Sequence, residues 1–392
     1  HGAQPATVVA VTGTNGKTST VDFLRQIFAA LHDGKAASLG TLGLIAPGFA
    51  KGPSLTTPDP TSLHETLAAL ARARIAHAAM EASSHGLDQR RLDGVRLAAA
   101  AFTTFTRDHL DYHGTMAAYL AAKLRLFDAL LEPGRPVVAP TRLAAEAMAG
   151  LREVAARRGL VLHTLGRGGS LIEVEALVPL AEGTRLALRC LGGRFELILP
   201  LVGFQAENAL TAAALAIVTG AEPARVFATL PGLAGVRGRI ERVARLANGA
   251  AVYVDYAHTP DAIAAVLAAL RPHCAGRLTL VFGAGGDRDP GKRAPMGEAA
   301  RAADRIIVTD DNPRSEDPAA IRAAVRAGCP PAEAIGDRAA AIAAAIAGLG
   351  PGDVAVIAGK GHEQGQIVGD RSIPFDDAAV AREAVERLGG RR

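Results

Sequence analysis

The chain has 392 residues, which predicts two or three domains, and a formal net charge of +4. Its Lys and Arg residues are scattered and 4% of residues are aromatic, which argues against a nucleic-acid partner and suits anionic small substrates. The three cysteines are far apart and favour a reducing cytoplasm over disulfides or structural zinc, and no apolar run approaches the roughly 18 residues of a membrane span.

Short apolar runs that predict strands alternate with longer helical patterns in the first half of the chain. Ser62 and Glu65 have the spacing of a capping box, and Thr115 is expected to cap a helix that extends to about residue 131. The pattern predicts strands at residues 7–12 and 97–105, helices from Thr18, Ser62 and Thr115, and a small antiparallel addition at residues 171–201.

A segment rich in glycine and proline, PGLAGVRGR at residues 231–239, interrupts this alternation. A second α/β series follows it. We therefore expect two domains, residues 1–234 and 235–392, each with a mostly parallel sheet. The second series comprises predicted strands at residues 251–255, 278–282, 305–309 and 353–358, and predicted helices at residues 261–270, 319–326 and 338–349.

Unusual polar clusters follow the predicted strands directly. In open parallel sheets, ligands bind at the carboxyl ends of the strands. These clusters therefore predict one functional edge in each domain. They are TGTNGKT, EASSHG and TFTRDHLDYH in the first half, and DYAHTPD, GAGGDRD, TDDNPR and AGKGHE in the second.

The first cluster has the features of a phosphate-binding loop. Its glycines allow backbone N–H groups to surround phosphate oxygens, and the following helix N-terminus adds a favourable dipole. Lys17 would reach the outer phosphates and Thr18 would ligate Mg²⁺. Val11 stands where the strict GxxxxGK[ST] pattern has glycine, and an ordinary strand–turn–helix junction is the alternative. The predicted phosphate site comprises Gly13, Thr14, Asn15, Gly16, Lys17 and Thr18.

Two charged residues in the first half stand in unusual positions. Glu81 ends a predicted strand, where a carboxylate suits Mg²⁺, although an exposed loop acid is the alternative. Lys123 falls within an apolar helix stripe, between Leu120 and Phe127. An inward-facing lysine is unusual unless it is paired, and the spacing alone allows equally for a stem that extends to the rim.

The loop TGTNGKTS is similar to the one shared by Mur ligases and folylpolyglutamate synthases, and EASSHGLDQRR resembles a Mur ligase segment. The resemblance implies an α/β fold, in which a P-loop central ATPase domain at residues 1–234 precedes a Rossmann-like, amino-acid-binding domain at residues 235–392. It implies ATP and Mg²⁺ as cofactors. It also implies that a muramoyl substrate binds at Thr56, Thr57, Ser83, Gln89 and Arg91.

Further roles follow from the same resemblance. In Mur ligases the lysine equivalent to Lys123 is carbamylated by CO₂, and its new carboxylate helps to hold Mg²⁺ together with Thr18 and Glu81. His109 would lie near Mg²⁺ and the acyl phosphate, whereas its spacing from His113 by itself allows a zinc site or ordinary loop histidines. The implied catalytic residues are Lys17, His109, Lys123 and Asp255.

Motifs in the second half resemble those of the diaminopimelate-adding Mur ligases. Asn208, Arg239 and Asp255 match segments that contact ATP. Arginine can hold a carboxylate through a bidentate fork, and glutamate can accept from an ammonium group; diaminopimelate carries two of each charge. The implied amino-acid site, in GGDRD, DNPR and GKGHE, comprises Arg288, Asp311, Asn312, Pro313, Arg314, Gly359 and Glu363.

The resemblance implies a ligase of peptidoglycan synthesis that joins meso-diaminopimelate to UDP-N-acetylmuramoyl-L-alanyl-D-glutamate through an acyl phosphate. It also implies an N-terminal uridine-nucleotide domain, which we expect this chain to lack because its first strand begins at Thr7. The alternatives are a folylpolyglutamate synthase-like ligase, a lysine-adding relative, which should lack Arg314, and a non-catalytic nucleotide-binding remnant. We expect a monomer.

Overall fold

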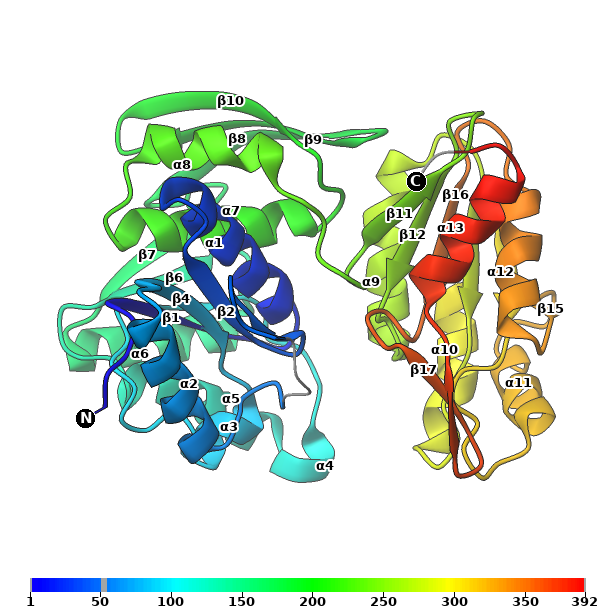
Figure 1. The fold of residues 1–392 in the computed structure, drawn as a ribbon, viewed down its shortest axis with the longest axis horizontal. Coiled ribbons are helices and arrows are strands. Elements are labelled where there is room, and N and C mark those ends of the chain that lie inside the picture. Colours follow the sequence, from blue (N-terminus) through cyan, green and yellow to red (C-terminus); the bar gives the residue numbers. More distant parts are fainter. Residues whose placement is uncertain (1, 51–54, 391–392) are drawn as a thin grey trace. The chain divides into compact units, whose positions relative to one another are not determined.

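The computed structural model describes residues 2–50 and 55–390. The described chain forms two compact units (Figure 1). The first comprises residues up to 178 together with 184–200 and 204–234, and the second comprises residues 179–183, 201–203 and those from 235 onward. No helix among the described residues is long and apolar enough to cross a membrane.

The described part of the first unit contains a sheet of ten strands in the order β10-β9-β8-β7-β6-β5-β1-β4-β2-β3. The pairs from β2 through β4, β1, β5, β6 and β7 to β8 are parallel, whereas β2–β3 and β9–β10 are antiparallel. The strands are β1 (Thr7–Thr12), β2 (Ala36–Gly40), β3 (Gly43–Ile45), β4 (His77–Glu81), β5 (Ala99–Phe102), β6 (Pro136–Pro140), β7 (Val161–Gly166), β8 (Ile172–Leu180), β9 (Gly183–Cys190) and β10 (Gly193–Leu199).

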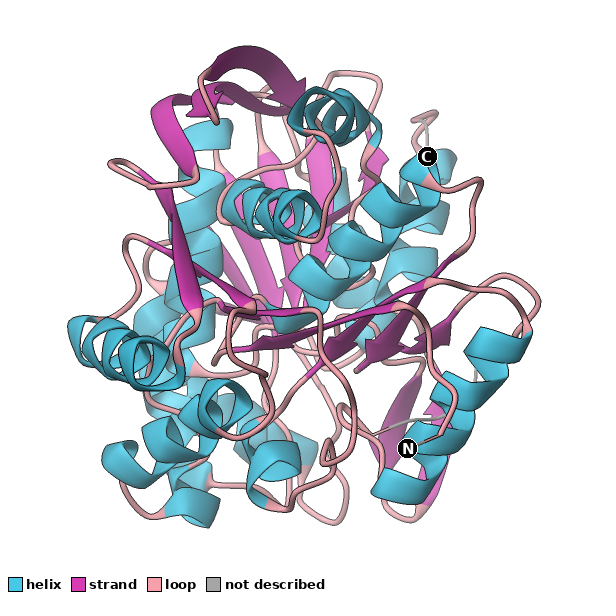
Figure 2. Cartoon of the chain, turned by 90° about the vertical axis from the view of Figure 1, so that its left-hand side faces the viewer, coloured by secondary structure: helices cyan, strands magenta, loops and turns pink. Residues whose placement is uncertain are grey.

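Helices cover both faces of this sheet, as Figure 2 shows. On one face α1 (Lys17–Leu31) packs against α7 (Gln205–Val218). On the other, alternate residues of the central strands form a buried core with α2 (Pro60–Arg72), α5 (Met116–Asp128) and α6 (Ala145–Arg158). The shorter helices of this unit are α3 (Ser84–Asp88), α4 (Leu110–His113) and α8 (Pro223–Thr229).

Two helix caps were predicted in this unit, and their outcomes differ. The Thr115 side chain caps α5 by accepting from the Ala118 N–H, as expected. Helix α2 begins earlier than predicted, because Asp59 is its N-cap and Pro60 its first residue. Ser62 lies inside the first turn and donates its own N–H to Asp59, so the predicted capping box at Ser62 is wrong.

The second unit has a sheet of six described strands in the order β11-β12-β16-β13-β14-β15, and the pairs from β12 to β15 are parallel. Its strands are β11 (Glu241–Arg245), β12 (Ala251–Asp255), β13 (Leu278–Phe282), β14 (Arg305–Val308), β15 (Glu333–Ala334) and β16 (Val354–Ala358). A separate hairpin is formed by β17 (Gly365–Val368) and β18 (Arg371–Pro374).

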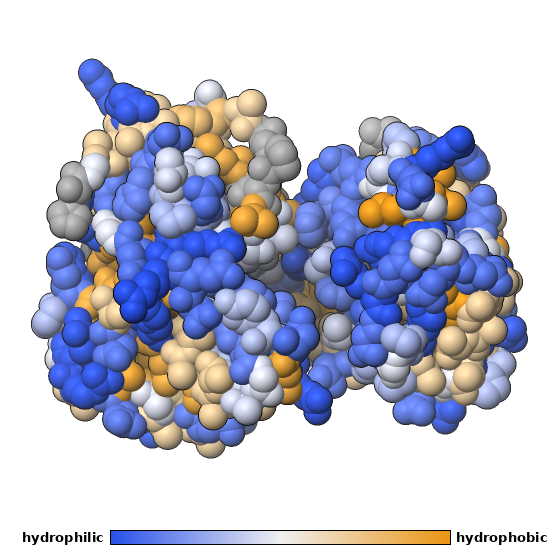
Figure 3. All heavy atoms as spheres, turned by 90° about the horizontal axis from the view of Figure 1, so that it is seen from below, coloured by the Kyte–Doolittle hydropathy of each residue, from blue (hydrophilic) through white to orange (hydrophobic). Residues whose placement is uncertain are grey.

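One face of the second sheet packs on α12 (Arg338–Ala347) and α13 (Asp377–Arg387) through a continuous hydrophobic core. Helix α10 (Arg293–Ala300) packs against both α9 (Pro260–Leu270) and α11 (Pro318–Arg326). On the face of the molecule drawn in Figure 3, hydrophilic residues cover most of each unit, and hydrophobic residues lie between them in small groups.

The parallel strands bring the polar clusters of each unit to one edge of its sheet, as predicted. The clusters follow β1, β4 and β5 in the first unit and β12, β13, β14 and β16 in the second. The mixed α/β class with large parallel sheets is therefore confirmed. The segment 171–201 adds β8, β9 and β10 to the first sheet, but β8 joins it through a parallel pairing with β7.

Candidate active site

The loop between β1 and α1 can accommodate glycine alone at two positions. Gly13 has φ +148°, and a Cβ atom there would clash with Oγ1 of Thr103. Gly16 has φ +86°, and its Cβ would lie 2.6 Å from Oδ1 of Asn208. Side chains from two other segments therefore approach the loop backbone closely, and this close approach leaves room for glycine alone.

Threonines that follow β5 hold this loop. The Thr14 N–H donates to the carbonyl oxygen of Thr104 at 2.7 Å, and the Asn15 N–H donates to Oγ1 of the same residue at 2.9 Å. Thr103 donates its hydroxyl to the Asn15 carbonyl at 2.6 Å. Sequence analysis missed Thr103 and Thr104 as supports of the loop, although both belong to the cluster that follows the predicted strand.

Two lysines meet at the same loop carbonyl. Nζ of Lys17 lies 2.9 Å and Nζ of Lys123 lies 2.8 Å from the carbonyl oxygen of Gly13. Lys123 is 1% exposed, and its ammonium lies 4.4 Å from the ring centroid of Tyr119. The rim-extending alternative for Lys123 is therefore excluded. Burial and then the charge of Lys17 hold the pKa of Lys123 well below its ordinary value.

Glu81 lies buried at the end of β4, where it faces hydroxyl groups. One carboxylate oxygen accepts from the Thr41 N–H at 2.7 Å, and the other accepts from the Thr18 hydroxyl at 3.1 Å. Glu81 is 1% exposed, so the exposed loop acid is excluded. A carboxylate beside two hydroxyls is an oxygen-rich group of the kind that suits Mg²⁺. The part played by Thr41 was not predicted.

The five residues predicted to bind a muramoyl substrate form one connected group. The Thr57 hydroxyl lies 3.0 Å from the Ser83 hydroxyl, and Thr56 lies 3.2 Å from Thr41 through their hydroxyl oxygens. Arg91 donates to the Thr57 carbonyl at 2.8 Å and to the Gln89 side chain at 3.0 Å through Nε. The structure thus brings all five residues together beside Glu81, whose carbonyl accepts from Thr57 at 3.0 Å.

His109 stands at the start of α4 in the left-handed region, with φ 53°. Its ring makes an edge-to-face contact with His85, with ring centroids 4.9 Å apart. Burial lowers the pKa of His109, Lys17 and Lys123 lower it further, and Asp108 opposes these effects. The His109 ring also lies 6.1 Å from the ring of Tyr119, measured between centroids, and the Lys123 ammonium lies over that same Tyr119 ring.

In the second unit, Asp255 ends β12 and is 6% exposed. Its carboxylate accepts from the N–H groups of Ile240 and Ala257, at 2.7 and 2.8 Å. The Arg239 guanidinium lies 4.5 Å from the ring centroid of Tyr256. Burial raises the pKa of Asp255, and the charge of Arg239 opposes this shift.

A second group of the same unit surrounds Arg314, which has φ 53°. Its N–H donates to the Ile367 carbonyl at 3.1 Å, and its Nη1 donates to the Gly286 carbonyl at 2.7 Å. A Cβ atom at Gly285 would lie 3.0 Å from Nη1 of Arg314 and 3.7 Å from Cγ of Arg288. The two predicted carboxylate-binding arginines therefore approach each other beside Gly285.

The remaining residues of the predicted amino-acid site adjoin this group. Nδ2 of Asn312 donates to Oε2 of Glu363 at 3.2 Å. Gly359 has φ +111°, and a Cβ atom there would lie 2.5 Å from Oδ2 of Asp311. Pro313 is buried between Asn312 and Arg314. The motifs GGDRD, DNPR and GKGHE, which lie far apart along the chain, thus meet at one sheet edge.

Comparison with known families identifies the chain. Residues 11–216 match the Mur ligase middle domain, and residues 238–361 match the Mur ligase glutamate ligase domain. The chain belongs to the Mur ligase family.

Two similar Mur ligases are named UDP-N-acetylmuramoyl-L-alanyl-D-glutamate--2,6-diaminopimelate ligase. The protein from Rhizobium meliloti is 52% identical over 100% of this chain and 79% of its own length. The protein from Caulobacter vibrioides is 53% identical over 98% of this chain and 80% of its own length.

Solved structures extend the comparison. A structure titled with the same ligase name is 34% identical, has a TM-score of 0.73, and matches 99% of this chain and 80% of its own. A folylpolyglutamate synthase of Mycobacterium tuberculosis has the same TM-score at 22% identity, over 91% of this chain and 88% of its own. The second likeness shows a shared fold alone.

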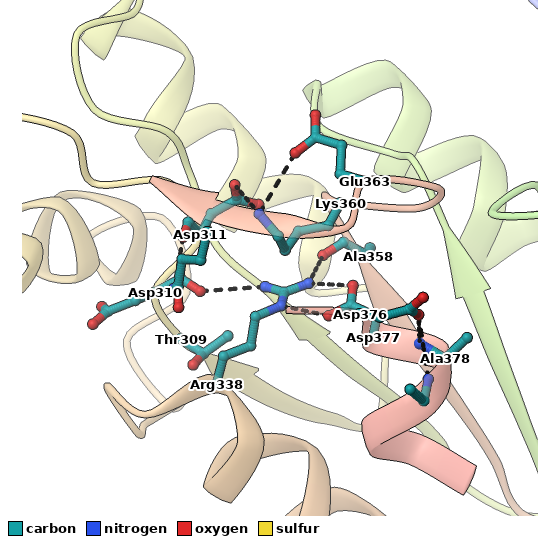
Figure 4. A network of polar contacts seen from close by, with 12 residues as sticks. Thr309, Asp310, Asp311, Arg338, Ala358, Lys360, Glu363, Asp376, Asp377 and Ala378 are labelled. Atoms are coloured by element: carbon teal, nitrogen blue, oxygen red, sulfur yellow. Dashed lines mark hydrogen bonds and ion pairs between the residues drawn. The ribbon is translucent and has the colours of Figure 1, made fainter. Parts of the chain in front are cut away.

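Within this Mur ligase, the structure also reveals two buried cations that sequence analysis did not single out. Lys360, in GKGHE, is fully buried and donates to Oδ1 of Asn312 at 2.8 Å. Arg338 is 2% exposed and pairs with Asp377 (Figure 4). Lys360 is part of the motif GKGHE, but a lysine between two glycines after a strand gives no sign in the sequence that its side chain turns inward.

Proposed function

We propose that this Mur ligase joins meso-diaminopimelate to UDP-N-acetylmuramoyl-L-alanyl-D-glutamate at the expense of ATP. Relatives at 50–53% identity carry the name of this reaction. The observation that carries the proposal in the structure is the approach of Arg288 and Arg314 beside Gly285, next to Asn312 and Glu363. Two arginines close to a glutamate suit a substrate with several carboxylates and ammonium groups.

Residues 1–234 are proposed as the ATP-binding domain. The glycine loop from Gly13 to Thr18 leads into the N-terminus of α1, whose N-cap is Gly16, and a helix N-terminus favours phosphate groups. Asn208 lies against this loop at Gly16. Arg239 and Asp255 are also proposed to contact ATP, as the resemblance to Mur ligases implies. Lys17 would offset negative charge on the phosphoryl group that moves to the D-glutamate carboxylate.

Mg²⁺ fits the oxygen donors of Thr18 and Glu81, and when bound it would neutralise phosphate charge. We propose that Lys123 supplies a further oxygen ligand as a carbamate. Its pKa is lowered, which favours the neutral amine. The amine nitrogen attacks the carbon of CO₂, and a C–N bond forms while one C=O π bond opens to give a carboxylate oxygen. The nitrogen then loses one proton to solvent. An ammonium at this position would instead repel the metal ion.

The D-glutamate carboxylate of the muramoyl substrate would lie near Glu81 and Lys123. The muramoyl dipeptide is proposed to bind to the connected group of Thr56, Thr57, Ser83, Gln89 and Arg91. The D-glutamate carboxylate attacks the γ-phosphorus of ATP, and ADP leaves. We propose that His109 contacts the acyl phosphate. Direct ligation of Mg²⁺ by its ring nitrogen is the less favoured role, because Mg²⁺ prefers oxygen ligands.

Residues 235–392 are proposed as the amino-acid-binding domain. Arg288 and Arg314 would hold carboxylates of diaminopimelate, and Glu363 would accept from one of its ammonium groups. Asp311, Asn312, Pro313 and Gly359 shape the same site. An amine of diaminopimelate, once deprotonated, attacks the acyl-phosphate carbon. The tetrahedral intermediate then expels phosphate and leaves the amide.

One assay tests the proposal against its alternatives. ADP release is measured with the muramoyl dipeptide or a folate as the acid substrate. Diaminopimelate, lysine or glutamate is the amino acid, and each compound is also tested alone. We expect ADP release that needs both the muramoyl dipeptide and diaminopimelate. Release with lysine in preference to diaminopimelate would contradict the assignment of Arg314. Glutamate-dependent release with a folate would favour a folylpolyglutamate synthase, and ATP binding without turnover would favour a non-catalytic remnant.

We further propose that the protein works as a monomer in the cytoplasm. Cys190, Cys274 and Cys329 are free thiols, and Cys190 and Cys329 are buried, which suits a reducing compartment. Sedimentation at several concentrations tests the oligomeric state, and a mass that rises with concentration would contradict a monomer.

A further inference from the structure

A fully buried ammonium lies between two loops of the proposed amino-acid site. Nζ of Lys360 lies 2.8 Å from Oδ1 of Asn312, 3.5 Å from Oε2 of Glu363 and 3.9 Å from Oδ1 of Asp311. The Lys360 side chain has 0% exposure, so it is out of reach of a substrate in solvent. Burying a charge is costly unless it is paired and hydrogen-bonded, and these three oxygens offset that cost.

Lys360 fixes which way the amide of Asn312 points. Oδ1 of Asn312 accepts from both Lys360 Nζ and the Ile367 N–H, the latter at 2.9 Å. Two donors at one amide atom require that atom to be the oxygen. Nδ2 must then face Glu363, to which it donates at 3.2 Å. Two residues of the proposed diaminopimelate site are thus oriented by one buried cation that does not belong to that site.

A second buried cation, Arg338, lies close to Lys360. In the view of Figure 4, Arg338 lies below it and pairs with Asp377 through two bonds of 2.7 Å. Arg338 also donates to the carbonyl oxygens of Ala358 at 2.9 Å and Asp310 at 3.4 Å. These carbonyls end the segments from which the DNPR and GKGHE loops begin. A second buried cation therefore ties the two loop bases together and limits any shift of Lys360.

We propose that Lys360 is a positioning and selectivity residue for the amino-acid substrate. It acts through Asn312, and its charge offsets the carboxylates of Asp311 and Glu363. Without that charge, the negative charges of the two carboxylates are less neutralised, and the site becomes more negative. Diaminopimelate has a distal carboxylate that they would repel, whereas lysine lacks this group. Removal of the Lys360 charge should therefore disfavour diaminopimelate more than lysine. This inference rests on the proposed function.

Two substitutions separate the hydrogen bond from the charge. Lys360→Met keeps the approximate length of the side chain and removes both, whereas Lys360→Gln retains a donor for Asn312. Steady-state kinetics are measured with diaminopimelate, lysine and ATP. We expect Lys360→Met to raise the KM for diaminopimelate about tenfold or more, with the KM for ATP changed less than about twofold. Its preference for diaminopimelate over lysine should fall about tenfold.

Lys360→Gln is expected to recover part of the KM for diaminopimelate but little of the preference, because the amide carries no charge. The matched control is Asp353→Asn. Asp353 lies at the opposite end of β16, is 6% exposed, and accepts from the N–H groups of Arg277 and Gly350 at 2.6 and 2.9 Å. This control should lower thermal stability while leaving the KM for diaminopimelate and the preference unchanged.

The outcomes distinguish a failure of the proposed function from a failure of the role proposed for Lys360. A wild-type protein that turns over ATP without using diaminopimelate would overturn the proposed function and this inference with it. A wild-type protein that uses diaminopimelate, together with Lys360 variants that keep its KM and preference, would overturn this inference alone. Lys360 variants that weaken ATP and diaminopimelate equally, as a destabilised fold would, also overturn it. If Lys360→Met does not fold, Lys360→Gln must show the loss of preference.

Discussion

Lys17 and Lys123 donate to the same carbonyl oxygen, that of Gly13, at N···O distances of 2.9 and 2.8 Å. Two ammonium groups this close repel each other, and the buried one loses its proton more easily. The pKa of Lys123 is accordingly lowered by burial and by Lys17. The charge of Lys17 thus adds to burial in favouring the neutral form of Lys123, which the proposed reaction with CO₂ requires.

Lys17→Ala should abolish ATP turnover and leave the fold intact. The Lys17 side chain is partly exposed and contacts loop carbonyls, so its loss removes a cation from the phosphate site and little packing. We expect the rate of ADP formation to fall by about 100-fold or more. Lys35→Ala, at an exposed lysine of the same unit, is the control. ADP formation at the wild-type rate by Lys17→Ala would show that the loop assignment is wrong.

Lys123 should carry one added CO₂, which mass spectrometry in bicarbonate at mildly alkaline pH would detect. Lys123→Ala should be inactive, with partial rescue by small carboxylic acids. The pH dependence follows from the amine, because carbamylation needs the neutral form. At limiting bicarbonate, activity should rise with pH through the lowered pKa of Lys123, and saturating bicarbonate should flatten this rise. An unmodified Lys123 whose removal leaves activity unchanged would contradict the carbamate.

The same pKa shift has a consequence for stability. Between the folded pKa of Lys123 and its ordinary value of 10.5, the unfolded chain binds the extra proton. The free energy of unfolding contributed by this site therefore rises with pH across that window. Below the folded pKa both states are protonated, and the full penalty for burying the charge remains.

Glu81→Gln should weaken the binding of Mg²⁺ without unfolding the protein. The amide oxygen can still accept from the Thr41 N–H, and the amide nitrogen can donate to a threonine hydroxyl. The lost negative charge should raise the Mg²⁺ concentration for half-maximal activity about tenfold or more. A Mg²⁺ titration of activity checks this, with Glu65→Gln, at an exposed position of α2, as the control. Equal titration curves for both variants would place the metal elsewhere.

Arg314→Ala should narrow the preference for diaminopimelate over lysine. The two amino acids differ by one distal carboxylate, and a lysine complex would leave Arg314 partly desolvated without that partner. Loss of one member of such a pair costs about 2–5 kcal/mol, a discrimination of roughly thirty- to several-thousand-fold. Arg314→Lys should rescue only partly, because an ammonium does not reproduce the bidentate fork.

Steady-state kinetics with both amino acids decide this prediction. The control is Arg387→Ala, whose side chain is 76% exposed at the end of α13. If Arg314→Ala keeps the wild-type preference, the selectivity lies elsewhere, and Arg288 is the next residue to test.

Arg338→Met should destabilise the second unit severely. The variant leaves Asp377, which is 0% exposed, without its bidentate partner. Breaking a buried pair in this way costs about 3–5 kcal/mol of unfolding free energy. The double variant Arg338→Met/Asp377→Leu should recover part of that loss. Denaturant unfolding measures both, and Arg387→Met should change the unfolding free energy by less than about 0.5 kcal/mol.

The sequence determined most of the regular elements, because burial imposes a local pattern. Strands β1, β12 and β13 coincide with the predicted runs, since parallel strands covered on both faces are continuously apolar. Thr115 caps α5 as predicted. The inward position of Lys123 followed from its place in an apolar stripe, but the stripe left open whether its ammonium was buried.

Only the tertiary structure decided which polar groups meet. Asp59 rather than Ser62 caps α2, because Pro60 fits the first helical position and two caps with similar sequence signals compete. The hairpin of β17 and β18 was not predicted, yet Ile367 in β17 holds the backbone of Arg314. Such pairings join residues far apart along the chain and therefore leave no local periodicity.

The motifs and the resemblance to Mur ligases supplied the predicted residues of the two candidate sites, because phosphate, metal and carboxylate binding each need particular side chains. They did not identify Thr41, Thr103, Thr104, Arg338 or Lys360, which support those residues. A supporting side chain is chosen by the space and the unpaired atoms around it after the strands have assembled. Lys360 between two glycines is therefore an unremarkable loop lysine in the sequence, and a buried cation in the folded protein.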